Sequence, residues 1–214
     1  MEDLGIERIS PEEIEFRSFA IITEELGDMP LEPGTELIVK RCIHASADFD
    51  YARSLYFSPG AVEAGLSALM GGARVVTDTQ MAYAGINKRA LSRLGGEVFC
   101  FMADEDVARE AKEKGVTRAS LCMDRAASLP GPVILAIGNA PTALIRLREL
   151  IDQGQISPAL IIGVPVGFVN VVASKELIMA SPVPCIVARG RKGGSSIAAC
   201  IVNALLYQLT ARPS

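Results

Sequence analysis

The stretch Val133–Gly163, VILAIGNAPTALIRLRELIDQGQISPALIIG, decides the fold that the sequence predicts. Five consecutive apolar residues, 133–137, predict a buried strand. Pro141 suits the first position of a helix that we expect over 141–154. A second apolar run, 159–163, follows that helix. A strand, a helix and a strand in this order predict two parallel neighbours in one sheet, joined by a crossover helix.

The same alternation continues on both sides of this unit. The segments between the apolar runs have the residue pattern of helices, and several of them end at glycine. This pattern is typical of an α/β fold, a three-layer sandwich whose mainly parallel sheet carries helices on both faces. Apolar runs bounded by turn residues predict the remaining strands near 54–57, 73–77, 97–101 and 184–188.

Two further helices precede this alternation. The residues SPEE at 10–13 are a capping-box signal for a helix that ends at Gly27. Thr35 then opens a second helix through about Ala47. We expect one domain over 1–214, with a helical N-terminal segment at about 10–48 and a parallel α/β part at about 49–210.

Composition limits the class of protein. Half of the 214 residues are hydrophobic, but Gly, Pro and Asn interrupt the longest apolar stretches, AIGNAPTALI and ALIIGVPVGFVNVVAS, before they reach the roughly 20 residues of a membrane helix. We therefore expect a buried sheet and no membrane partner. No secretory pattern is visible at the N-terminus, and five cysteines without a CxxC motif indicate reduced thiols in the cytoplasm and no metal site. A net charge of −4 without a basic run argues against a nucleic-acid partner.

Sheets of this kind bind ligands beyond the carboxyl ends of their strands. The loops expected there read TDTQMAYAGIN, IGNAPTA, GVPVGFVN and ARGRKGGSS. They are rich in Gly, Asn, Thr and Ser, and so offer free backbone N–H groups and small side chains. The sequence therefore predicts that a polar, charged ligand binds at this edge.

His44 is the only histidine, and it lies on the second predicted helix with Arg41 three residues earlier on the same face. Histidine is the side chain best suited to exchange a proton near neutral pH, so His44 is the candidate acid or base; the alternative is an ordinary core or surface histidine. Asp48 either orients His44 or is a solvated carboxylate at the helix end, and we favour the second interpretation. Arg17 and Ser18, in the apolar context EIEFRSFAII, mark either a ligand-facing edge or an arginine that reaches solvent from the helix edge.

The segment ARGRKGGSS combines basic side chains with glycines at a helix start. Arg189, Lys192, Gly193 and Ser195 are the candidate anion-binding residues, because a helix N-terminus and free N–H groups favour negative charge. The spacing is not that of a phosphate-binding Walker A loop. The alternative is a glycine turn with a solvated basic flank.

The other three loops supply the remaining candidates. Asp78 is either a helix cap or a ligand-binding group, and Asn139 also fits a cap ahead of Pro141. The loop GVPVGF fits either a surface that lies against the flat face of a large ring or a simple turn. The candidate substrate-binding residues of these loops are Thr77, Asp78, Thr79, Asn139, Gly163, Pro165 and Gly167.

Taken in order, six segments resemble one family. RCIHASAD, FSPG, VVTDTQM, GNAPTAL, IGVPVGFVN and ARGRKGGSS are similar to segments of the precorrin-8X methylmutases, including the cobalt-precorrin-8 form. The resemblance extends from about Arg17 to Leu206. GNAPTAL and GVPVGFVN are its most specific parts.

The resemblance implies a flavodoxin-like fold, a homodimer and a tetrapyrrole substrate. It implies an isomerase that shifts a methyl group from carbon 11 to carbon 12 of precorrin-8X or cobalt-precorrin-8, giving hydrogenobyrinate or cobyrinate. No cofactor is expected, because the migrating methyl is already on the substrate. The family's proton-transferring histidine matches His44, and its substrate-contacting serine and arginine match Ser18 and Arg41. Hand-over of product to neighbouring enzymes of cobalamin biosynthesis is a further expectation.

Two hypotheses from other classes stay open at this point. One is a non-catalytic corrinoid carrier, which turnover would distinguish from an enzyme. The other is an unrelated flavodoxin-like domain that binds a phosphate or nucleotide, for which only the glycine-rich loops argue.

Overall fold

The sheet of this protein has six strands, in a computed structural model that describes residues 9–210. The strand order is β1-β6-β5-β4-β2-β3, and every neighbouring pair is parallel except β1 with β6. Without the antiparallel edge strand β1, the order of the parallel strands is that of flavodoxin-like sheets. The predicted α/β class and mainly parallel sheet are confirmed. The strands are β1 Leu55–Phe57, β2 Arg74–Thr77, β3 Glu97–Phe99, β4 Val133–Ile137, β5 Leu160–Gly163 and β6 Cys185–Ala188.

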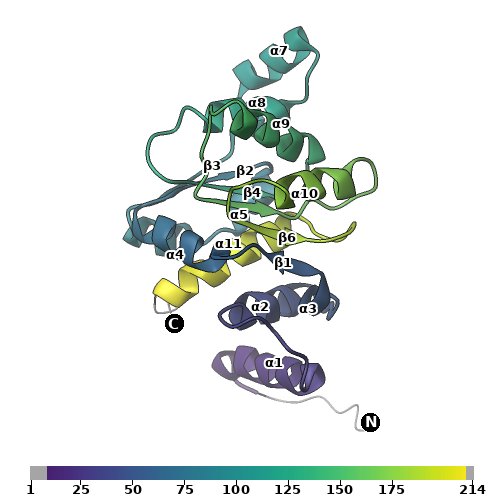
Figure 1. The fold of residues 1–214 in the computed structure, drawn as a ribbon. Helices are drawn as coiled ribbons and strands as arrows, with labels where there is room; N and C mark the ends of the chain where they lie inside the picture. Colours follow the sequence, from purple (N-terminus) through teal and green to yellow (C-terminus); the bar gives the residue numbers. More distant parts are fainter. Residues whose placement is uncertain (1–8, 211–214) are drawn as a thin grey trace, which may run out of the picture.

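Helices cover both faces of the sheet, as Figure 1 shows, with α8, α9 and α10 above it and α4 and α11 below it. The central strand β4 explains why its sequence is apolar throughout. Ile134 and Ala136 belong to the core on one face, and Val133, Leu135 and Ile137 belong to the core on the other. The helices of these layers are α4 Ala61–Met70, α5 Gln80–Gly85, α6 Lys88–Arg93, α7 Glu105–Lys114, α8 Arg118–Ala126, α9 Pro141–Asp152, α10 Val171–Met179 and α11 Ser195–Leu209.

The N-terminal helices α1 (Pro11–Leu26) and α2 (Glu36–Ser46) form an extra layer outside α11. α2 packs on α11, and α1 lies on the outer side of α2 (Figure 1). The predicted capping box is seen where the Glu13 carboxylate accepts the backbone N–H of Ser10 at 3.1 Å. Within residues 9–210, no helix is both long and apolar enough to cross a bilayer.

Three local predictions need correction. The segment TDTQMAYAGIN is not all loop, because α5 begins where the Thr79 hydroxyl accepts the N–H of Ala82 at 3.1 Å. The strand predicted near 54–57 begins at Leu55, because Ser54 belongs to a single helical turn, α3 (Tyr51–Ser54). The strand predicted at 97–101 ends at Phe99, and a 3₁₀ turn, η1 (Phe101–Ala103), begins at its predicted last residue.

Candidate functional site

The carboxyl ends of β2 and β4 meet at the point where the strand order reverses, which is where flavodoxin-like sheets often bind ligands. Here a side chain of the protein fills that position. The buried Asp78 carboxylate accepts the N–H groups of Gly138, Asn139 and Ala140 at 2.9, 2.8 and 2.6 Å. Burial raises the pKa of Asp78, and these three bonds oppose the rise. Asp78 therefore joins the loop after β2 to the loop after β4.

This arrangement bears on the phosphate-binding hypothesis. The N–H groups that would receive a phosphate at this position are already bonded to Asp78. The start of α11 also closes the position, since a Cβ on Gly138 would lie 2.6 Å from the Cα of Ser195. Nothing in this geometry favours a nucleotide site of the flavodoxin type.

A hollow of about 350 Å³ opens instead between α2, α5 and α11. A second one, of about 260 Å³, lies between α1 and α2. His44 lines both, with Arg41 in the first and Ser18 in the second. The other lining residues of the first hollow are Ala45, Met81, Gly85, Ser196, Ala199, Cys200, Asn203 and Tyr207.

His44 is exposed at the last turn of α2, and its ring lies 5.6 Å from that of Phe19 on α1. The imidazole is therefore accessible from both hollows while one side rests on an aromatic ring. Asp48 does not orient His44. Its carboxylate pairs with Lys192 at 2.7 Å, so it is not simply solvated either.

Arg41 is the most buried cation beside His44, with a side chain only 11% exposed. Its guanidinium pairs with Glu15 of α1 at 2.8 Å and lies over the rings of Phe19 and Tyr207, at 5.3 and 4.7 Å. Burial lowers the pKa of Arg41. Its Nε is buried and has no hydrogen-bond acceptor among residues 9–210.

The two candidates on α1 differ in position. Ser18 faces the second hollow, where its hydroxyl donates to the carbonyl of Ile14 at 2.8 Å. Arg17 is exposed and belongs to neither hollow.

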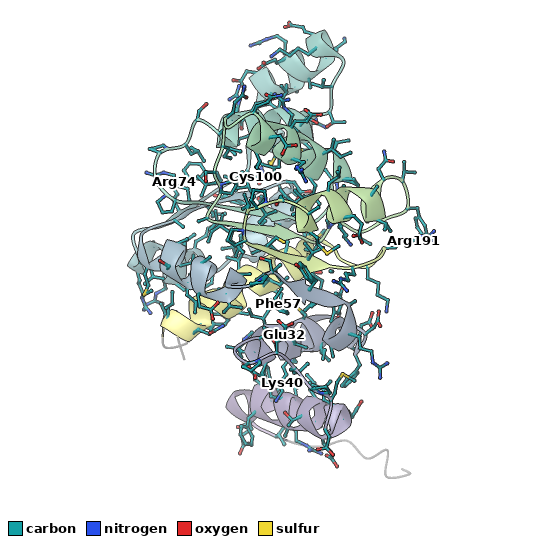
Figure 2. The ribbon with its side chains drawn as sticks, viewed as in Figure 1. Glu32, Lys40, Phe57, Arg74, Cys100 and Arg191 are labelled. Atoms are coloured by element: carbon teal, nitrogen blue, oxygen red, sulfur yellow. The ribbon has the colours of Figure 1, made fainter. Side chains whose placement is uncertain are left out.

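The loop after β6 carries the predicted anion-binding residues. Arg189 and Arg191 are exposed and lie over the rings of Tyr56 and Phe168, at 4.8 and 5.4 Å. Figure 2 shows Arg191 at the edge of the molecule, beyond the end of β6. Lys192 is paired with Asp48 and Asp50, at 2.7 and 3.2 Å, so its charge is already partly neutralised.

Glycines let this loop pack against the loop after β5. A Cβ on Gly193, which has φ +153°, would lie 2.1 Å from the carbonyl oxygen of Val164. Gly167, at φ +137°, donates its N–H to the carbonyl of Arg191 at 3.1 Å. Gly163 has room for a methyl group, with its nearest neighbours at 3.5 Å. The segment 164–170 forms neither helix nor strand, and it exposes Phe168, which is 81% accessible.

The remaining candidates hold loops in place. The buried Thr77 hydroxyl donates to the carbonyls of Thr79 and Phe99, at 3.1 and 3.3 Å. The Thr79 hydroxyl is also 2.8 Å from that of Ser195, which joins the starts of α5 and α11. Asn139 is exposed and is not the helix cap, since α9 has Ala140 at that position.

Sequence reasoning missed several residues that the fold brings to this region. Cys200, Asn203 and Tyr207 of α11 line the first hollow, but α11 is apolar enough to be taken for core. The isolated amide of Asn203 was the available signal, and it bonds Asn87 and Gly85 at 2.8 Å each. Lys175 on α10 was also missed, because a lysine within a helix ordinarily reaches solvent.

A hollow of about 400 Å³ between α8 and α9 contains none of the predicted residues. Its arginine, Arg146, is paired with Asp124 and Glu149, at 2.8 and 2.7 Å. Because these charges already pair with one another, this hollow is a poorer candidate for a functional site than the hollows around His44.

Fold and site together define a class: a flavodoxin-like α/β protein with an open crevice that combines one accessible histidine and a buried arginine. The comparisons with known proteins agree with this class and narrow it. A family model described as precorrin-8X methylmutase matches residues 13–208. The chain therefore belongs to the precorrin-8X methylmutase family, which are isomerases of cobalamin biosynthesis.

Individual relatives cover nearly the whole chain. The cobalt-precorrin-8 methylmutase of Priestia megaterium is 45% identical over 197 residues, covering 92% of this chain and 88% of its own. That of Salmonella typhimurium is 43% identical, covering 93% and 96%. The crystal structure of a precorrin-8X methylmutase from Thermus thermophilus has a TM-score of 0.84 at 43% identity, covering 92% and 95%.

Proposed function

We propose that this protein moves the methyl group on carbon 11 of precorrin-8X or cobalt-precorrin-8 to carbon 12, acting as one methylmutase domain over 1–214. The observation that carries the proposal is the position of the chain's only histidine, exposed between two hollows and beside a buried arginine. Three relatives at 43–45% identity have the cobalt form in their names, so cobalt-precorrin-8 is the first substrate to assay.

The proposed chemistry needs few groups. His44 donates a proton to the macrocycle, the methyl group migrates within the ring system, and a proton returns to the histidine. The ring's acetate and propionate groups are anions, and the buried guanidinium of Arg41 and the stacked ones of Arg189 and Arg191 suit carboxylates. Lys192 is a weaker candidate because Asp48 and Asp50 already hold it.

The test uses the fact that a methyl shift changes the spectrum of the substrate but not its mass. Purified protein is incubated with cobalt-precorrin-8 and, separately, with precorrin-8X, and followed by visible spectroscopy and mass spectrometry. We expect a spectral change at constant mass with at least one substrate. Tight binding without a spectral change would instead identify a corrinoid carrier, and a change in mass would identify a different reaction.

Replacing Arg41 with alanine is expected to raise KM by roughly 10- to 100-fold, because a charge-assisted hydrogen bond contributes about 1.5–3 kcal/mol. Arg189→Ala should also raise KM, and the increase in KM in both variants should be smaller at high salt. The matched control is Glu15→Gln, which removes the carboxylate that now occupies Arg41 at 2.8 Å. Glu15→Gln should leave KM unchanged or lower it. Unchanged KM in both arginine variants would remove the carboxylate-binding role.

We also propose a homodimer with the site near the subunit interface. Neither hollow can enclose a tetrapyrrole, and large apolar residues are exposed, Met81 (69%) in the lining of the first hollow and Phe16 (79%) on α1. Light scattering should give twice the chain mass of 22.7 kDa. A stable monomer at assay concentration with full activity would contradict this proposal.

A further inference from the structure

Lys175 of α10 is a buried lysine, with only 1% of the residue exposed. Its ammonium donates to the carbonyls of Gly190 and Lys192, at 2.9 and 2.8 Å. No carboxylate of residues 9–210 lies within ion-pair distance of it. Burial lowers the pKa of Lys175 to about 8. Burying a cation without a counter-ion costs free energy. The burial of Lys175 therefore needs an explanation beyond its two hydrogen bonds to carbonyls.

The explanation that the structure offers is that Lys175 fixes the conformation of the loop 189–194. Three consecutive carbonyls are held from the inside, those of Gly190 and Lys192 by Lys175 and that of Arg191 by the N–H of Gly167. Both ends are fixed as well, because Arg189 donates its N–H to Ser54 at 2.7 Å and Gly194 donates to Val164 at 2.9 Å.

With its carbonyls held, the loop keeps its donors available. Residues 190 and 191 form a turn, and the backbone N–H groups of Gly190, Arg191 and Gly193 donate to no acceptor among residues 9–210. The guanidinium groups of Arg189 and Arg191 rest on aromatic rings, and neither pairs with a carboxylate of that part of the chain. Successive free N–H groups beside basic side chains form an anion-binding surface.

We propose that Lys175 is a positioning residue for the substrate: it holds the loop 189–194 so that its N–H groups and its two arginines receive carboxylates of the macrocycle. This proposal rests on the proposed function. Lys175 itself touches no substrate. Its ammonium adds positive charge beneath the same surface, and the bound anion supplies the counter-charge that the interior lacks.

The test compares Lys175→Met with wild type and with Lys88→Met. The control removes another lysine that donates to a backbone carbonyl, that of Tyr83 at 2.6 Å, but an exposed one outside this loop. For Lys175→Met we expect KM for cobalt-precorrin-8 to rise roughly tenfold, with kcat within about twofold of wild type. A purely structural role predicts the opposite, a lower kcat that follows the folded fraction with KM unchanged, and this result would overturn the proposal.

A second readout needs no substrate. Trypsin can cleave after Arg189, Arg191 and Lys192. Cleavage at these three positions should be several times faster in Lys175→Met than in wild type and in Lys88→Met. Equal cleavage rates would show that Lys175 does not hold the loop. If wild type turned over neither substrate, the proposed function would fail, and cleavage alone would then decide the role of Lys175. If Lys175→Met did not fold, Lys175→Gln, which keeps two N–H donors without charge, is judged by the same criteria.

Discussion

His44→Ala is expected to lower kcat by roughly 10²- to 10⁴-fold, the range that a positioned acid or base contributes. The fold should survive, because His44 is exposed and its main contact is with the ring of Phe19 on the outer helix α1. Single-turnover rates measured at saturating substrate test this directly. Product affinity should change little, since the arginines that we propose bind carboxylates remain.

The matched control for this variant is Ser46→Ala, on the same turn of α2. The Ser46 hydroxyl donates to the carbonyl of Cys42 at 2.7 Å and accepts the N–H of Asp48 at 3.2 Å, and it lines neither hollow. Ser46→Ala should turn over at close to the wild-type rate. A near wild-type rate in His44→Ala would remove His44 from the chemistry, and an equal loss in both variants would point to damage of the helix.

Gly193→Ala is expected to destabilise the protein by about 3 kcal/mol or more, which corresponds to a fall in Tm of roughly 6–12 °C for a chain of this size. The added methyl group would lie 2.1 Å from the Val164 carbonyl oxygen, and backbone cannot move aside as a flexible side chain can. The methyl group would also force apart the loops after β5 and β6, which approach each other at Gly193 and Val164.

Gly190→Ala is the matched control in the same loop. Gly190 has φ +74° but no atom within 4 Å of the added Cβ, so only the backbone conformation is penalised, by about 1–2 kcal/mol. Calorimetry of the two variants measures the difference. If Gly190→Ala lost as much stability as Gly193→Ala, backbone strain and not the contact with Val164 would explain both.

Much of the fold could be predicted because its strands are apolar on both faces. The run 133–137 predicts a central strand, and its alternate residues do enter two separate cores. The short elements were harder. α5 has six residues and α3 has four, and tertiary packing together with the Thr79 cap stabilises such segments more than their own pattern does.

The site was predictable only where a residue type is rare. His44 stood out as the only histidine, and Arg41 as a cation in an apolar helix. Asp78 looked equally suited to a ligand or a cap, because its real partners are backbone N–H groups 60 residues and more away along the chain. Lys175 carried no signal, since only the tertiary structure places its ammonium under the loop after β6.

The central claim is that His44 delivers a proton to a macrocycle bound in this crevice, and the pH dependence of the single-turnover rate tests it most directly. The measurement follows the spectral change at saturating cobalt-precorrin-8 from about pH 5.5 to 9, the range over which a histidine exchanges its proton. If His44 is this proton donor, only its protonated imidazole can start the reaction. The rate should therefore be highest on the acid side, fall through one ionisation as pH rises, and lose this ionisation in His44→Ala. A rate that rises steadily with pH would contradict the account, because the neutral imidazole would then be the active form.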